Sequence, residues 1–334
     1  MTIPFLKLPY LIQLEVFKQL RYQEIFLLSL CSKNFNLRIQ RLQLSPQIVS
    51  YVLGTNEYQV FVRNNDMIPH LLVHMKNVSE HIDVDRHVLR NLGGKSLKCR
   101  HDISTRTSYS LDYFDSDGAL ESLQNHVNIL FRNKPRVQLD THFFHNSVIN
   151  DVRDAIIQYE MLGRRELDAF MTAHPNLQNL KILSTLLMWD IPPEILNIEG
   201  LSVDQPNITV PMIIERFNGK YLILNNAQLE RLTLMTLVMG WRKKMTHHNL
   251  RAVIVKTYDP IRDIRGLLRS LGVRRFDGLR RPRTFRFDSK LITLESNLSE
   301  EIDCSNYYDI QQDDGGKWAS IRLTTNKVRF FVWD

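Results

Sequence analysis

Apolar residues near the start of the chain recur at steps of three and four, which is the period of a helix. Pro9 suits the start of such a helix, because its missing N–H group would have no partner there anyway. A second apolar segment begins at Glu24 and Ile25, where a carboxylate in the first turn favours the helix dipole. Two or three short helices are therefore predicted within residues 1–45. Their apolar positions include Leu8, Ile12, Leu14, Val16, Phe17, Leu20 and Ile25.

Helices of this size cannot bury all of that apolar surface among themselves. We therefore expect them to pack on the rest of the chain or on another protein.

After a loop near residue 46, short apolar runs alternate with helical stretches. Strands are predicted at 58–62, 136–140, 180–183, 201–203, 221–224 and 250–256. Helices are predicted at 118–131, 148–172, 210–217 and 228–243. The last four strands start at Leu180, Leu201, Tyr221 and Leu250, a spacing close to the ~20–29 residues of a leucine-rich repeat. This pattern indicates an open, curved strand–helix array.

The C-terminal residues follow a different pattern, with side chains that alternate in 317–324 and turn signals on either side. Strands at 307–312, 317–324 and 328–333 predict an antiparallel β-meander that caps or extends the array. The fold class is thus α+β or α/β. A small helical module at residues 1–45 precedes an open leucine-rich-repeat-like strand–helix array at 46–334, which ends in the meander.

Composition narrows the possible roles without naming one. Of 334 residues, 43% are hydrophobic and 24% charged, as in ordinary globular proteins. Three cysteines without a CxxC pair argue against a disulfide framework or a Cys-rich zinc site, and favour the cytosol or nucleus. No run approaches the ~20 apolar residues of a membrane span, so no membrane partner is expected. The net charge of +7 permits an acidic partner or nucleic acid.

No motif supports catalysis, a cofactor or a metal. The run Gly93-Gly94-Lys95-Ser96 imitates the end of a P-loop, but Leu89 stands where the motif needs glycine. His70 and His74 would share a helical face, yet no glutamate follows the first as a metalloprotease motif requires. We therefore expect a protein that is not an enzyme.

A dense run of nine arginines lies between residues 262 and 286. Guanidinium groups bind carboxylates and phosphates with two parallel hydrogen bonds, so an acidic or phosphorylated target would suit them. The candidate acidic-target residues are Arg262, Arg265, Arg269, Arg274, Arg275, Arg280 and Arg281. A solvated face neutralised by the acidic residues near Glu301 is the competing interpretation. Nucleic acid is an unlikely partner, since no aromatic residues for base stacking are interleaved with the arginines.

The N-terminal residues resemble the F-box. The resemblance is carried, without a gap, by Leu8-Pro9, Ile12, Leu14, Val16-Phe17, Leu20, Glu24 and Ile25, and then by Cys31-Ser32-Lys33 and Phe35. Leu11 departs from the glutamate that is common in the family, and Arg21-Tyr22 departs from its Asp-Pro. Residues 46–334 are similar to the F-box-associated domain of a large nematode group, through NLQNLKIL, residues 201–256 and Phe330-Phe331-Val332-Trp333.

This resemblance implies a non-enzymatic substrate receptor of a cullin-RING (SCF-type) E3 ubiquitin ligase, in the cytoplasm or nucleus. The F-box would bind a Skp-type adaptor through Leu8, Pro9, Ile12, Leu14, Val16, Phe17, Leu20 and Ile25. Residues 46–334 would bind an unknown target protein. The alternative is a stand-alone repeat-type protein that recognises acidic protein or nucleic acid, with its N-terminal helices capping the array. The two differ in whether residues 1–45 are folded onto the array or project from it with their apolar stripe exposed.

Overall fold

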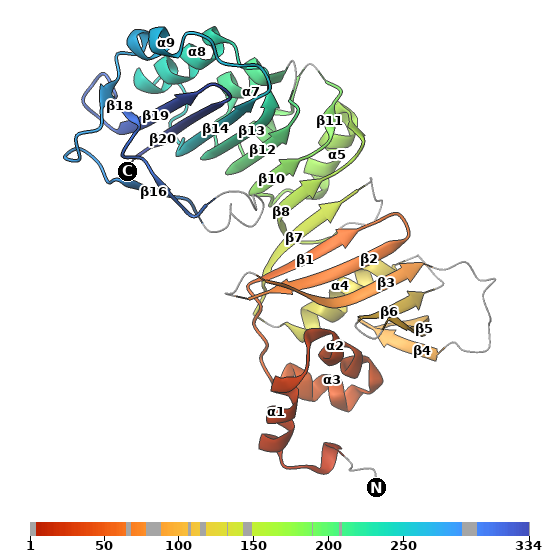
Figure 1. Ribbon diagram of the computed structural model, residues 1–334. Coiled ribbons are helices and arrows are strands. Elements are labelled where there is room, and N and C mark those ends of the chain that lie inside the picture. Colours follow the sequence, from red (N-terminus) through yellow and green to blue (C-terminus); the bar gives the residue numbers. More distant parts are fainter. Residues whose placement is uncertain are drawn as a thin grey trace. The chain divides into compact units, whose positions relative to one another are not determined.

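The computed structural model describes residues 5–64, 68–77, 88–105, 108–113, 118–131, 133–142, 149–188, 190–206, 209–288 and 299–333. The chain forms two compact units, residues 1–152 and residues 153–334. Their elements are labelled in Figure 1.

Unit 1 begins with four short helical elements and continues as a mostly antiparallel sheet. The helices are η1 (Phe5–Lys7), α1 (Tyr10–Gln19), α2 (Tyr22–Cys31), α3 (Lys33–Gln40) and, later in the chain, α4 (Ala119–Leu130). The strands are β1 (Ile48–Leu53), β2 (Glu57–Arg63), β3 (Pro69–Asn77), β4 (Val88–Leu92), β5 (Lys95–Thr105), β6 (Ser108–Tyr113) and β7 (Arg136–Thr141). The predicted N-terminal helices, the helix at 118–131 and the strands at 58–62 and 136–140 are confirmed.

The sheet of unit 1 has the order β7-β1-β2-β3-β6-β5-β4, in which only the β1–β7 and β3–β6 pairs are parallel. The sequence pattern had predicted strand–helix units from residue 46 onward. In the described ranges between residues 48 and 113, the structure has strands β1 to β6 and no helix. Antiparallel strands need no crossover helix, because a tight turn joins them. Between β4 and β5 that turn is Gly93-Gly94, with φ angles of 58° and 99°.

Local capping explains where the N-terminal helices begin. The Glu24 carboxylate accepts a hydrogen bond of 2.8 Å from the backbone N–H of Arg21, at the start of α2. The Ser32 hydroxyl accepts one of 3.2 Å from the backbone N–H of Phe35, at the start of α3. Each bond satisfies a donor that a helix start leaves without an internal partner.

Helices α2 and α3 are packed against the rest of unit 1. Helix α2 contacts β3 and β4, and α3 contacts α4. The Phe26 side chain is fully buried and meets the ring of His126 edge-on at 5.3 Å. The Ser29 hydroxyl lies 2.7 Å from Nε2 of the same histidine. The first 45 residues therefore share a core with the sheet that follows them.

Unit 2 contains a parallel strand array with helices between the strands. The strands are β8 (Val152–Ile157), β9 (Met161–Leu162), β10 (Asn179–Ile182), β11 (Thr185–Leu186), β12 (Gly200–Asp204), β13 (Tyr221–Ala227) and β14 (Ala252–Thr257). The helices are α5 (Arg164–Ala173), α6 (Pro193–Leu196), α7 (Val210–Arg216), α8 (Arg231–Arg242) and α9 (Ile264–Ser270). Strands β8, β10, β12, β13 and β14 pair in parallel in that order.

The predicted strands that begin near Leu180, Leu201, Tyr221 and Leu250 are confirmed. The predicted helix at 148–172 is wrong for most of its first half, where β8 and β9 lie. β8 pairs in parallel with β10, and the Asn179 side chain of β10 donates a 2.8 Å hydrogen bond to the buried Asp154 carboxylate of β8. Pairing with a strand distant in sequence thus overrides the local helical pattern.

The C-terminal strands of the described chain are β15 (Arg274–Arg275), β16 (Thr284–Arg286), β17 (Glu301–Asp303), β18 (Tyr308–Gln311), β19 (Trp318–Thr324) and β20 (Lys327–Val332). Of these, β15, β18, β19 and β20 extend the sheet of unit 2, while β16 and β17 pair with each other in a separate two-stranded sheet. Strands β18, β19 and β20 form the predicted antiparallel meander, and β20 pairs with β14. β15 pairs with β18 at the edge.

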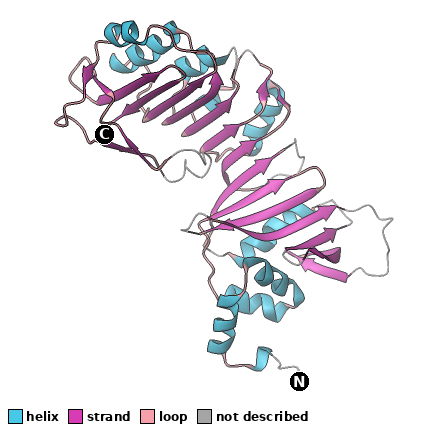
Figure 2. Ribbon diagram, viewed as in Figure 1, coloured by secondary structure: helices cyan, strands magenta, loops and turns pink. Residues whose placement is uncertain are grey.

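The sheet of unit 2 is covered differently on its two faces. Helices α7, α8 and α9 gather on one face (Figures 1 and 2). On the other face, Phe285 and Phe287 of the β16 segment pack against a buried cluster on β13, β14 and β20. Phe285 stacks on Phe331 at 4.5 Å between ring centroids. The β16–β17 pair thus closes a second small core.

Candidate functional site

Helix α1 carries an exposed apolar surface. Leu11 is 71% exposed, Ile12 48% and Val16 40%. These three residues, here called the α1 stripe, line a shallow hollow of about 420 Å³ together with Glu15 and Gln19. Neighbouring apolar residues at this exposure form a surface suited to protein contact.

The other face of α1 is held against its own module. Phe17 is 2% exposed and meets Phe5 edge-on at 5.3 Å. The buried Gln13 side chain donates to the Leu8 carbonyl at 2.6 Å and accepts from Arg38 at 2.8 Å. Sequence reasoning missed Gln13, although a polar residue inside an apolar helical pattern was the signal for it. The bond to Arg38 fixes α1 on α3, and the bond to Leu8 holds the residues just before α1.

The structure divides the predicted adaptor-binding residues into two groups. Pro9, Ile12 and Val16 are exposed, whereas Leu8, Leu14 and Leu20 are half-buried. Phe17 and Ile25 are buried in this structure. A helical pattern shows which positions are apolar, but a helix packed on both sides buries some of them in its own protein.

Residues 5–45 match the model of the F-box domain. The F-box segment contains all of α1, α2 and α3, and therefore the whole α1 stripe. No curated protein and no solved structure matches the chain. Among the described helices, none is long and apolar enough to cross a membrane.

The arginine run is split by the structure into buried and exposed members. Arg281 is buried, with its Nε 2.7 Å from the Asp309 carboxylate. Its terminal nitrogens donate to the Pro282 and Cys304 carbonyls at 2.9 and 2.8 Å, and its guanidinium lies 4.1 Å from the ring centroid of Phe276. Arg281, one of the predicted acidic-target residues, is therefore buried against groups of its own protein. The charge is satisfied inside the protein.

Three further arginines of the run have carboxylate partners nearby. Arg280 pairs with Asp277 at 3.1 Å and lies over the Trp318 ring at 5.3 Å. Arg283 pairs with Asp303, and Arg286 with Glu301. The competing interpretation of a neutralised face holds for these positions. Arg262, Arg265, Arg269, Arg274 and Arg275 are exposed, and none of them forms an ion pair with a carboxylate in the described ranges.

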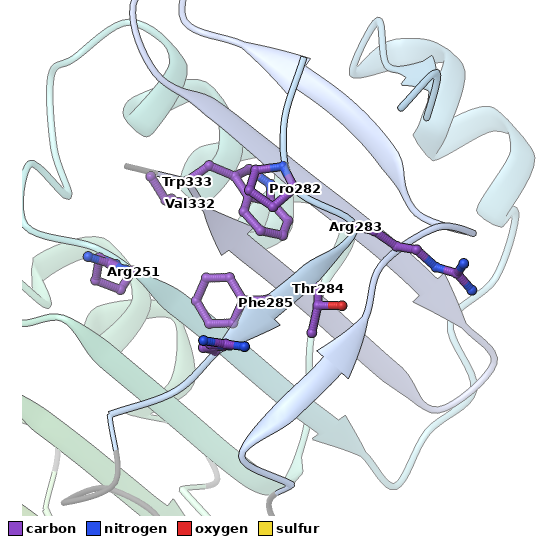
Figure 3. A pocket seen from close by; sticks show the side chains of 8 residues that line it. Arg251, Pro282, Arg283, Thr284, Phe285, Val332 and Trp333 are labelled. Atoms are coloured by element: carbon purple, nitrogen blue, oxygen red, sulfur yellow. The ribbon is translucent and has the colours of Figure 1, made fainter. Parts of the chain in front are cut away.

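A hollow of about 520 Å³ lies beside the β16 segment (Figure 3). Phe285 and Trp333 form its apolar wall, and Arg251 lies at its rim. In Figure 3 the Arg283 side chain points away from Phe285; it pairs with Asp303 at 2.7 Å. The hollow is therefore lined by a mixture of apolar and basic residues, with Arg251, Arg283 and Arg286 around the aromatic wall.

The other motifs serve the fold. Gly93-Gly94 is a hairpin turn and not a phosphate loop. His70 and His74 lie on β3, and Nε2 of His74 is 2.8 Å from the Glu57 carboxylate. Within the described part of the chain, no group of three or more histidine, cysteine or acidic side chains could hold a metal ion.

Proposed function

We propose that this chain is the substrate-receptor subunit of an SCF-type cullin-RING ubiquitin ligase. The F-box segment would bind a Skp-type adaptor, and the residues after 45 would hold a target protein. The observation that carries this proposal is the α1 stripe, an exposed apolar surface inside the segment that matches the F-box. As a receptor, the chain would act by proximity, raising the effective concentration of a target lysine near the ubiquitin thioester.

The arrangement of the N-terminal helices supports this function over the stand-alone alternative. A module that only caps a strand array would hide its apolar stripe against that array. Here α2 and α3 do pack on the rest of unit 1, yet Leu11, Ile12 and Val16 remain exposed on α1. An adaptor would cover an apolar surface that the described chain leaves in water.

The finer assignments belong to the same proposal. We propose residues 1–45 as the adaptor-binding module and residues 46–334 as a nematode-type F-box-associated domain. The parallel pairing of β10, β12, β13 and β14 in chain order supports a leucine-rich-repeat-like array in unit 2. Within the adaptor surface, Pro9, Ile12 and Val16 would make contact, while Phe17 and Ile25 would shape the module from inside. A cytoplasmic or nuclear receptor without catalysis of its own fits this role.

The test is adaptor binding by full-length variants of the α1 stripe. The double variant Ile12→Asp/Val16→Asp places two charges on a surface that the adaptor would dehydrate, and should weaken binding by about 100-fold or more. Leu232→Asp, a matched change at a residue 74% exposed in unit 2, should leave binding unchanged. Truncation of residues 1–45 is unsuitable, because it would uncover the surface that Phe26 buries.

Binding to a panel of purified Skp-type adaptors, measured by calorimetry, distinguishes the outcomes. Loss in the α1 variant alone supports the receptor function. A folded wild-type chain that binds no adaptor, or an α1 variant that binds as tightly as wild type, would favour the stand-alone binding protein.

A further inference from the structure

The five exposed arginines lie on one short, well-anchored stretch of unit 2. We call Arg262, Arg265, Arg269, Arg274 and Arg275 the α9 arginine surface, since they lie before, on and just after α9. The Asp263 carboxylate accepts a 3.0 Å hydrogen bond from the backbone N–H of Gly266, which caps the helix. Leu267 is buried beneath it. Helix α9, which lies near α8 (Figure 1), is thus held in place.

Three acidic residues near this surface are already engaged with other cations. Asp263, besides capping α9, pairs with Arg231 of α8 at 3.4 Å. Asp313 pairs with Arg242, and Asp309 is buried against Arg281. The surface therefore keeps an excess of positive charge, which attracts an anionic partner and repels a cationic one.

The spacing of the arginines fits an extended peptide. Arg265 and Arg269 are four residues apart on α9, so their side chains leave the helix about 6 Å apart along its axis. An extended chain advances about 6.6–6.8 Å for every two residues. Carboxylates at alternate positions of a strand-like segment would therefore meet successive arginines.

The rings near this surface argue against nucleic acid. Phe276 lies under the Arg281 guanidinium and Trp318 under that of Arg280, so cations cover the faces that bases would stack on. Leu279, four residues after Arg275 in the sequence, is 90% exposed. Exposed guanidinium groups followed in the sequence by an exposed leucine suit a protein segment that mixes acidic and apolar residues.

We propose that the α9 arginine surface binds an acidic segment of a target protein, with carboxylate or phosphate groups as the anions. Calling that segment a ligase target rests on the proposed function, whereas the binding itself does not. The surface differs from the residues first predicted from the sequence, because Arg280 and Arg281 are engaged within the protein.

The experiment compares two full-length double variants that remove the same charge. Arg265→Gln/Arg269→Gln changes the α9 arginine surface, and Arg283→Gln/Arg286→Gln changes two exposed arginines that have carboxylate partners. The probe is a short fluorescent peptide with glutamate at alternate positions and leucine between some of them. A second probe carries phosphoserine in place of glutamate, and a third is a single-stranded RNA of equal charge.

In fluorescence anisotropy at low salt, the α9 variant should bind the acidic peptide about tenfold more weakly than wild type, with little change in the control. Tighter binding of the phosphoserine peptide would identify phosphate as the preferred anion. Equal losses in both variants, no binding of either peptide by wild type, or tighter binding of the RNA would overturn the proposal. Adaptor binding by the same variants should be unchanged, so failure of the receptor function would be seen separately.

Discussion

Replacing Arg281 by methionine tests whether the arginine run is in part a structural feature of unit 2. The change removes a guanidinium whose side chain is 1% exposed and leaves the Asp309 carboxylate, 2% exposed, without its counter-ion. The Ser320 hydroxyl, which donates to Asp309 at 2.8 Å, would then be the main group left to stabilise the charge. Methionine has a similar length, so the expected loss is mainly electrostatic.

Removing one partner of a buried ion pair costs about 3–5 kcal/mol, because the other charge stays buried and uncompensated. For a unit of this size, each kcal/mol lowers the melting temperature by about 2–4 °C, which gives a fall of about 6–20 °C. Thermal unfolding of the full chain by circular dichroism measures this shift. Hydrogen exchange would localise it to the strands around Asp309.

Two further variants make this prediction specific. Arg283→Met removes an exposed arginine only two residues away and should leave the melting temperature nearly unchanged. Arg281→Met/Asp309→Leu removes both buried charges and should recover part of the lost stability. If Arg281→Met destabilised the protein no more than Arg283→Met does, the burial argument would be refuted, and Arg281 would return to the list of target-binding residues.

Two other predictions concern unit 1. Burial lowers the pKa of His126 to about 4, so the unfolded state takes up a proton first as the pH falls. The stability that this histidine supports is complete above about pH 6.5 and should decline by about 3 kcal/mol towards pH 4. Acid titrations of unfolding should show a shallower decline of the unfolding free energy for His126→Gln than for wild type. Equal slopes for the two proteins would count against this reasoning. Gly93→Ala should destabilise unit 1 by about 2 kcal/mol or more, because the new Cβ would lie 2.2 Å from the Ser122 carbonyl oxygen. In Gly94→Ala the new Cβ meets only open space, so the positive φ alone should cost about 1 kcal/mol of unfolding free energy. Urea unfolding measures both variants, and equal losses of stability in the two would contradict the steric argument.

Much of the local structure could be predicted, because it depends on short-range periodicity. The three N-terminal helices follow from steps of three and four, and the meander at the C-terminus follows from alternation and turn residues. The strand starts near Leu180, Leu201 and Tyr221 follow from apolar runs spaced about one strand–helix unit apart. In each case neighbours in the sequence supply the determining interactions.

The errors arise where distant residues decide. β8 has a local pattern that is compatible with a helix, but pairing with β10 makes it a strand. The sheet at 48–113 could not be anticipated as one mostly antiparallel body, since its strands owe their order to long-range pairings such as the parallel pair of β3 with β6. Strand propensity depends strongly on such partners.

For function, the sequence by itself determined that an F-box-like helical module opens the chain, and that a dense arginine run lies near residue 270. Only the tertiary structure decided which of those residues can meet a partner. Phe17 and Ile25 turn inward while Ile12 and Val16 stay exposed, and Arg281 is buried although Arg265 and Arg269 are not. The physical reason is that side-chain type and spacing set what a residue can bind, whereas burial and the nearest counter-charge depend on segments far away in the chain.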